Sequence, residues 1–258
     1  MIERHRKDRP SPVVFLLSLS ALVACWAVLA AFKADAMVLP GPLDVWRVAV
    51  AETLSGRLLR ELAATLLRVV AAFVLAMAAG SILGIVLGRM RALDRWFDPW
   101  VTVFLNLPAL VLIVLCYLWI GLNEVAAITA VTLNKTAMVI VTIRQGVRAF
   151  DPALDDLATV SRLSQKARLR HIVLPQLAPW FAISARNGIS VIWKIVLVVE
   201  FLGRSNGVGF RIHLYFQQFQ TAHVLVYSLA FVGVMLLVEY AIIQPWERHG
   251  NRWRRESA

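Results

Sequence analysis

The chain has 258 residues, of which 59% are hydrophobic and 17% are charged. A soluble domain could not bury that much apolar surface, so the composition predicts an integral membrane protein whose apolar side chains face lipid. The formal net charge of +11 would also suit a nucleic-acid-binding protein. Most Lys and Arg residues, however, lie in segments expected on the cytosolic side of a membrane. We therefore expect contact with the lipid bilayer and no nucleic acid as a partner.

Six apolar stretches of about 20 residues are each long enough to cross a bilayer as a helix. They lie at about residues 12–32, 62–88, 100–120, 125–143, 177–201 and 224–243. Lys and Arg are concentrated in both terminal segments and in the loop after the fourth stretch, which favours the cytosolic side for all three. The sequence thus predicts a cytoplasmic N-terminus at residues 1–11, a six-helix transmembrane domain at 12–243 and a basic cytoplasmic tail at 244–258.

The segment between the first two stretches contains a turn signal and then apolar residues at helical spacing. Val38-Leu39-Pro40-Gly41-Pro42 is the turn, and Leu43, Trp46, Val50 and Leu54 follow it. This pattern predicts a short amphipathic helix that lies against the lipid headgroups on the outer face.

The second stretch has a small residue at every fourth position. Such a strip lets another helix approach closely, which is how helices pack where lipid removes the hydrophobic drive. Arg68 lies within the first two turns of this stretch, and we expect its long side chain to extend toward water rather than bind a ligand. The small residues are Ala72, Ala76, Gly80, Gly84 and Gly88.

The third stretch follows Arg89, Arg91 and Arg95, which mark a return of the chain to the cytosol. Near its beginning lies Asn106-Leu107-Pro108. Because proline removes one backbone hydrogen bond and clashes with the preceding turn, the sequence predicts a kink there.

The fourth and fifth stretches contain polar residues that are candidates for a translocation pathway. A lysine near the bilayer centre costs roughly 2.5 to 3.5 kcal/mol, so Lys135 and Lys194 should face the interior of the bundle or a wet cavity. Two alternatives stay open: a buried ion pair of either lysine with Glu200 or Glu124, or a helix boundary shifted by a few residues. The predicted pathway residues are Asn134, Lys135, Thr136, Trp193 and Lys194.

The longest polar interruption of the chain is Asp151–Pro175, within the loop 144–176. Six Lys or Arg residues lie between Ile143 and Leu177, so we expect this loop on the cytosolic side. Asp151 as N-cap and Pro152 in the first turn predict a short helix. One face of this helix could dock on a partner, and it would carry Leu154, Leu157, Ala158 and Ser161.

This loop resembles the cytoplasmic signature of the permease subunits of ATP-binding-cassette (ABC) importers, which runs Glu-Ala-Ala, then Gly, then hydrophobic residues and Leu-Pro. Here Asp156-Leu157-Ala158 replaces Glu-Ala-Ala, Arg162 replaces the Gly, and Ile172-Val173-Leu174-Pro175 closes the motif. Leu157 and Arg162 are departures from the pattern. The resemblance implies a coupling helix that fits a groove on the ATPase subunit. Its coupling residues would be Asp155, Asp156, Leu157, Ala158, Ser161, Arg162 and Leu163.

Other stretches, in the same order, look like permeases of the nitrate, sulfonate and taurine importer group. The resemblance implies a MetI-like fold, with six transmembrane helices and a cytoplasmic coupling helix, in the cell (inner) membrane. It also implies a permease homodimer, cytosolic ABC ATPase subunits, and a periplasmic or extracellular solute-binding protein that delivers a small anionic solute. The stretches are Val38-Leu39-Pro40, 66–70, Leu107-Pro108-Ala109, 118–121 and 195–201.

The sequence offers no motif for energy conversion or catalysis. No Gly-x4-Gly-Lys-Ser/Thr motif occurs, and the five histidines have no metal-ligand spacing. We expect no catalytic residue, metal site or cofactor in this chain, with ATP and Mg bound by the partner ATPase. The alternative is an ion-coupled secondary transporter or channel working without an ATPase, with Lys135, Lys194 and Glu200 as a charge relay. Many such carriers show an internal repeat of spans, and none is visible here.

Overall fold

The computed structural model describes residues 12–33, 35, 37–151, 153–154, 160–161, 163–238 and 241. Every regular element within these residues is helical, so the all-α prediction is confirmed. In chain order the elements are α1 (Pro12–Lys33), α2 (Pro42–Leu54), α3 (Arg57–Arg89), α4 (Arg91–Asn106), α5 (Ala109–Ile120), α6 (Glu124–Arg148), α8 (Gln165–Arg168), the π-helical turn η1 (Leu169–Val173), α9 (Leu174–Gly203), α10 (Val208–Gln217) and α11 (Thr221–Val238).

Within the described residues, four helical runs are long and apolar enough to cross a membrane, namely α3, α6, Lys166–Gly203 and α11. The pair α4 and α5 is a fifth if it is counted as one span, and α1 contains a shorter apolar run, Leu17–Lys33. Each of the six predicted stretches overlaps one of these helices, and α2 occupies the predicted amphipathic segment. The predicted terminal segments 1–11 and 244–258 lie outside the described residues.

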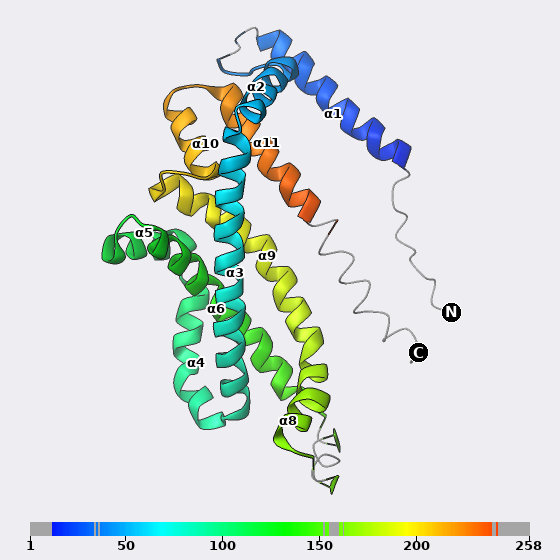
Figure 1. Ribbon diagram of the computed structural model, residues 1–258, viewed down its shortest axis with the longest axis vertical. Coiled ribbons are helices and arrows are strands. Elements are labelled where there is room, and N and C mark those ends of the chain that lie inside the picture. The colour runs from blue at the N-terminus through cyan, green and yellow to red at the C-terminus, as the bar shows by residue number, and fades with distance from the viewer. Residues whose placement is uncertain are drawn as a thin grey trace.

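The third predicted stretch is two helices instead of one kinked helix. α4 ends at Asn106, α5 begins at Ala109, and the two are bent by 99°. Pro108 has no amide hydrogen, and the residue before a proline disfavours the helical conformation, so Leu107 adopts φ −66° and ψ 122°. α5 therefore turns away from α4, which lies beside α3 (Figure 1).

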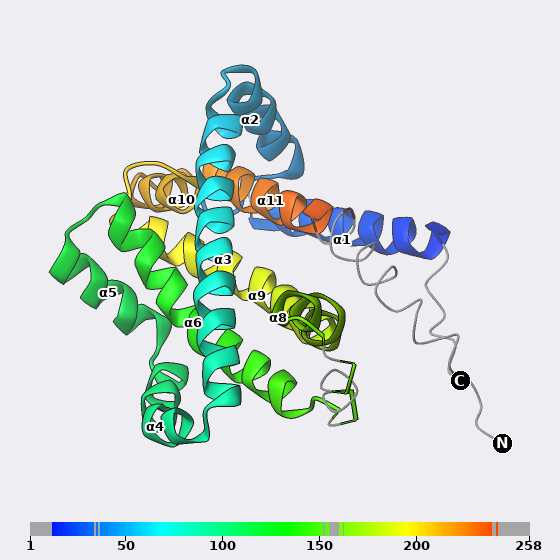
Figure 2. The same cartoon turned by 60° about the horizontal axis from the view of Figure 1, so that its bottom comes forward.

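α3 is a long straight helix that runs from α2 to α4 (Figure 2). Its 33 residues at a rise of ~1.5 Å give a helix of about 50 Å, longer than the ~30 Å hydrocarbon core of a bilayer. We call the end of the molecule that carries α2 and α10 the α2 end, and the opposite end the α8 end (Figure 1). α1 extends away from the other helices, and the Trp26 indole N–H donates to the carbonyl of Pro40 at 3.1 Å.

The predicted strip of small residues is the surface on which α6 packs. A Cβ added at Gly80 would lie 2.5 Å from the Cβ of Val139, and one added at Gly84 would lie 2.9 Å from the carbonyl oxygen of Ile140. Both separations are too short for a side chain on α3, so the backbone of α3 at these glycines lies directly against residues of α6. The predicted close helix contact is therefore present, and α6 is its partner.

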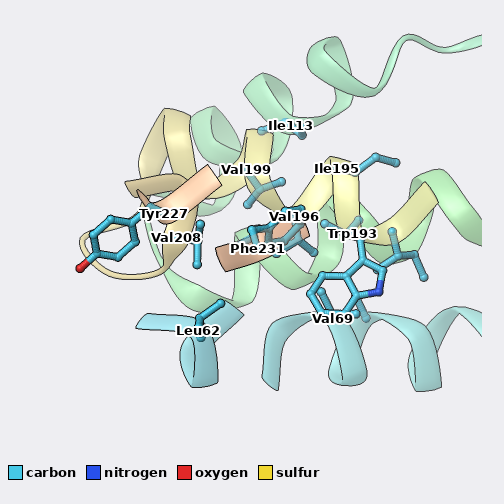
Figure 3. Packing of buried hydrophobic residues seen from close by; sticks show 14 of the residues in the cluster. Leu62, Val69, Ile113, Trp193, Ile195, Val196, Val199, Val208, Tyr227 and Phe231 are labelled. Carbon is cyan, nitrogen blue, oxygen red and sulfur yellow. The ribbon is translucent and has the colours of Figure 1, made fainter. Parts of the chain in front are cut away.

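The main core lies where α9 passes between α3 and α11 (Figure 3). Trp193 of α9 packs edge-to-face against Phe231 of α11, with ring centroids 5.3 Å apart. Val69 of α3 and Val196 of α9 belong to the same buried cluster. These apolar contacts fix the centre of α9 and leave its two ends to position polar groups.

Candidate functional site

Two of the predicted coupling residues, Ser161 and Leu163, are described, and they lie at the α8 end between α6 and α9. Asp155, Asp156, Leu157, Ala158 and Arg162 lie outside the described residues. Ser161 and Leu163 are described and exposed, and so are the neighbouring apolar side chains of Leu154 and Val160. Apolar side chains exposed on a polar loop are typical of a surface that contacts another protein.

Hydrogen bonds and apolar contacts fix both ends of the loop to the helices beside it. Asp151 accepts a hydrogen bond from the backbone N–H of Ala153 at 2.9 Å, in the manner of a helix N-cap. The backbone N–H of Asp151 donates to Oε1 of Gln176 at 2.9 Å, which ties the start of the loop to the start of α9. Val173 of η1 is buried in a cluster with Val147 of α6. The ends of the loop thus move with α6 and α9.

A group of ion pairs joins α6 to α4 near the same end. Arg144 donates to Oδ1 of Asp94 at 2.8 Å and to Oδ1 of Asp98 at 2.6 Å. Arg148 donates to the second carboxylate oxygen of Asp94. Asp94 is mostly buried, and two arginines on successive turns of α6 neutralise its charge.

The predicted pathway residues of α6 lie inside the helix bundle. Lys135 is 2% exposed and donates to the carbonyl of Asn187 at 3.1 Å and to the sulfur of Met138 at 2.9 Å. No carboxylate pairs with Lys135 among the residues that the structure describes. Thr136 is buried and Asn134 is half-buried. The structure therefore places an uncompensated ammonium group between α6 and α9.

The predicted pathway residues of α9 point in different directions. Trp193 is 1% exposed and lies in the core, where its indole N–H has no hydrogen-bond partner among the described residues. Lys194 is exposed, and Ser190 and Asn187 are exposed on the same face, four and seven residues earlier. α9 thus presents a polar face, which we define as Asn187, Ser190 and Lys194, on a helix that is long and apolar enough to cross a membrane.

The expectation that Arg68 extends toward water is wrong. Arg68 is 5% exposed and donates to both carboxylate oxygens of Glu124, at 2.6 and 3.0 Å. It also donates to Oε1 of Glu200 at 2.6 Å and to the carbonyl of Asn206 at 3.0 Å. Glu124 pairs in addition with Arg204 at 2.7 Å. The alternative in which Lys135 or Lys194 pairs with these two glutamates is therefore wrong as well.

The N-terminus of α10 is held by side chains of α3 and α9. Gly207 N–H donates to Glu61 at 2.6 Å, Val208 N–H to the Thr65 hydroxyl at 2.9 Å, and Gly209 N–H to Glu200 at 2.9 Å. Two carboxylates at the positive end of a helix are favourable. Gly207 has φ 104°, which a residue with a side chain adopts only under strain.

Glu61 also pairs with Arg211 of α10. The Arg211 guanidinium donates two hydrogen bonds to Glu61, at 2.8 and 3.0 Å. Burial lowers the pKa of Arg211, but its hydrogen bonds and its attraction to the Glu61 charge outweigh this and raise the pKa above its ordinary value. Arg211 is therefore charged at every physiological pH. We call this set of ion-paired and hydrogen-bonded groups the α2-end network: Glu61, Thr65, Arg68, Glu124, Glu200, Arg204, Asn206 and Arg211.

α2 is fixed to the bundle by a neighbouring buried carboxylate. Glu52 is 2% exposed, accepts from the Tyr227 hydroxyl at 2.8 Å and pairs with Arg57 at 2.9 Å. Sequence reasoning missed both Glu52 and the α2-end network. A signal was available, because single carboxylates such as Glu61 and Glu200 beside or within long apolar runs imply buried partners.

Among the described residues, no group of three or more His, Cys, Asp or Glu side chains could hold a metal ion. The polar groups that are present are cations on α6 and α9 and ion pairs at the two ends of α6. Such an arrangement can attract an anion and can join helices.

Comparison with known proteins identifies the family. Residues 62–244 match the family described as "Binding-protein-dependent transport system inner membrane component". The chain is 28% identical over 239 residues to a probable ABC transporter permease protein of Brucella abortus, with 93% of this chain and 94% of the relative covered. It is 27% identical over 240 residues to the putative aliphatic sulfonates transport permease protein SsuC of Bacillus subtilis, with 93% and 87% covered.

A solved structure with the same fold is a chain of the MetNI methionine ABC transporter in inward-facing conformations. The TM-score is 0.65 at 16% identity, and the match covers 78% of this chain and 99% of the other. This likeness supports the fold, and the sequence match covers most of the membrane-embedded part. The chain therefore belongs to the binding-protein-dependent transport system inner membrane component family, and it is a multi-pass membrane permease subunit of an ABC importer.

Proposed function

We propose that this permease works as a homodimer that moves a small anionic solute along a pathway lined by the polar face of α9. The observation that carries the proposal is the exposure of Lys194 on that face. A lysine that faced lipid at this depth would cost roughly 2.5 to 3.5 kcal/mol, so the face belongs against water or another protein. A second copy of the chain, placed against this face, would enclose a wet pathway between the two subunits.

The charge of the pathway favours a negative solute. The ammonium group of Lys194 is a compact point charge that prefers an anionic partner. Lys135, with only a carbonyl and a sulfur as described partners, supplies a second positive charge next to Asn187 of the polar face. We also assign to the pathway the sequence neighbours of the two lysines, Asn134, Thr136 and Trp193, of which Trp193 would border it from the core. The sulfonate assignment of the Bacillus subtilis relative supports this class of solute.

The orientation follows from the basic residues. The α8 end and both termini would lie in the cytosol because Lys and Arg are concentrated there. The α2 end would face the external binding protein. The loop residues Asp155, Asp156, Leu157, Ala158, Ser161, Arg162 and Leu163 would dock on the ATPase subunits, which bind ATP and Mg, while this chain has no catalytic activity of its own.

Transport would proceed by alternating access. Closure of the two ATPase subunits on ATP would draw the two loops together and favour the outward-open state, and hydrolysis would return the permease to the inward-open state. Nucleotide binding shifts the equilibrium between the two states because the ATPases bind the loops differently in each state.

The pathway is tested by uptake into proteoliposomes that contain the permease, its ATPase and its binding protein, with radiolabelled ethanesulfonate, taurine and nitrate as probes. We expect Lys194→Ala to lower uptake by about tenfold, the equivalent of ~1.4 kcal/mol, and Lys194→Arg to retain most of it. Lys33→Ala, which removes an exposed lysine of α1, is the control. Unchanged uptake by Lys194→Ala for every probe would exclude Lys194 from the pathway.

The coupling loop is tested by the double substitution Asp156→Arg and Leu157→Arg. We expect these bulky cations to prevent docking, so that the ATPase subunits no longer copurify and uptake stops. Transport by the permease alone, without ATPase or binding protein, would instead favour the ion-coupled carrier.

A further inference from the structure

α6 runs without interruption from the α2 end to the coupling loop. It has 25 residues, from Glu124 to Arg148, with no proline, and at ~1.5 Å per residue it is about 37 Å long. Its last turn leads directly into the loop that begins at Asp151. A displacement of that loop therefore acts on the end of a single stiff helix.

The C-terminal half of α6 packs tightly on α3. A Cβ added at Gly80 or Gly84 would lie 2.5 or 2.9 Å from an atom of α6, which is closer than side chains pack, so the two helices are in direct contact there. Near the α8 end, Arg144 also joins α6 to Asp94 of α4. The C-terminal half of α6 is therefore held against α3 and α4, and we expect a displacement of the loop to be passed along α6 toward Glu124.

At its other end, α6 is joined to the α9–α10 connection by its first residue. Glu124 accepts two hydrogen bonds from Arg68 and pairs with Arg204 of the connection at 2.7 Å. Arg68 in turn donates to the carbonyl of Asn206 at 3.0 Å. One carboxylate thus reaches the α9–α10 connection in two ways, directly through Arg204 and indirectly through Arg68.

We propose that Glu124 is a positioning residue that carries movement of the cytosolic loop, through α6, to residues 204–207 and to α10 at the outer face. This inference rests on the proposed function and adds the route by which the ATPase end controls the solute-entry end. The α10 helix would follow, because Gly207 of the connection is its N-cap.

Glu124 can be tested apart from its neighbours because of its exposure. Its side chain is 44% exposed, whereas Glu200 is fully buried, and both pair with Arg68. Glu124→Gln keeps the shape of the side chain and leaves the Arg68–Glu200 pair in place, so the variant should fold. Asp44→Asn is the matched control, because Asp44 is an exposed carboxylate that pairs only with Arg47, at 3.8 Å, among the described residues of the same end.

The experiment compares the reconstituted complexes of wild type, Glu124→Gln and Asp44→Asn. We expect all three to show the same basal ATPase activity, while stimulation by the solute-loaded binding protein, and uptake, fall by about fivefold or more in Glu124→Gln alone. Glu124→Asp, which restores the charge, should recover part of the loss. Equal stimulation in Glu124→Gln and wild type would overturn the inference, and so would a proportional loss of basal and stimulated activity, which indicates a merely structural role.

A second measurement follows the connection itself. Ser205 is exposed, and Ser205→Cys, in a Cys25→Ser background, reports its accessibility to a membrane-impermeant maleimide. We expect the labelling rate to change between the nucleotide-free and the ATP–vanadate states in wild type, and not in Glu124→Gln. A nucleotide-dependent change of the same size in both proteins would overturn the proposed route. A wild-type complex without ATP-dependent uptake would instead refute the proposed function, and the inference with it.

Discussion

Replacing Gly84 by alanine is a direct test of the contact between α3 and α6. The new Cβ would lie 2.9 Å from the carbonyl oxygen of Ile140 and 2.9 Å from the Cβ of Ile143. Carbon contacts are favourable at about 3.5–4.0 Å, so the helices would have to separate by roughly 0.5–1 Å. Such overpacking costs about 1–3 kcal/mol, and the better helix propensity of alanine returns about 1 kcal/mol. We expect a net loss of up to about 2 kcal/mol.

Gly233→Ala is the control, because Gly233 lies within α11 and has no atom within 4 Å of an added Cβ. It should gain up to about 1 kcal/mol from helix propensity alone.

The measurement is the temperature at which half of the purified protein leaves the monodisperse peak in size-exclusion chromatography after heating in detergent. A change of 1 kcal/mol corresponds to about 2–4 °C for a chain of this size, so Gly84→Ala should lower this temperature by up to about 8 °C. Gly233→Ala should leave it unchanged or raise it. The reverse order of the two variants would refute the close contact between α3 and α6.

Three further substitutions test the ion pairs. Arg68→Ala leaves Glu200, which is 0% exposed, without its guanidinium partner. The substitution should lower the stability of the fold by about 3–5 kcal/mol, which would be seen as a low yield of folded protein. Arg68→Lys should lose less, and a wild-type yield for Arg68→Ala would contradict the pairing. Asp94→Asn removes the charge that neutralises two arginines of α6 and should cost about 1–3 kcal/mol in the heating assay, so an unchanged midpoint would show that the α4 contact is dispensable. Gly207→Ala needs φ 104° and places its Cβ on the Glu200 carboxylate, so it should fold far worse than Gly56→Ala, where φ is 72° and the space is open; equal yields would count against the tight α10 connection.

The helices could be predicted from the sequence because long apolar runs have few alternatives in a membrane. Pro108 also gave the position of the break between α4 and α5. The size of the bend, 99°, could not be predicted, since a missing hydrogen bond permits a turn and the packing of α5 on its neighbours sets the angle.

The pairing of charges was the weakest part of the prediction. The sequence indicated that buried lysines need carboxylates, and the available carboxylates, Glu124 and Glu200, pair with Arg68 and Arg204 instead. Which cation meets which anion depends on how α3, α6 and α9 are placed in space. No local pattern in the sequence records that placement.

The two candidate lysines show the same limit. Lys135 and Lys194 both lie near the middle of an apolar run, yet the side chain of Lys135 is buried and that of Lys194 is exposed. The phase of each helix relative to its neighbours decides this difference. Identification of the loop as a coupling element rested on resemblance, and its central residues remain a prediction.

The contacts of Arg68 also constrain how the protein is made. Its partners Glu200 and Asn206 are 132 and 138 residues further along the chain, and Gly207 is 146 residues from Glu61. During synthesis, therefore, α3 enters the membrane long before most of the groups that neutralise its polar end exist. The nascent first half must be shielded by the insertion machinery or by lipid headgroups until α9 and α10 arrive. Chains that stop before residue 200 should accordingly be recognised as incomplete and degraded.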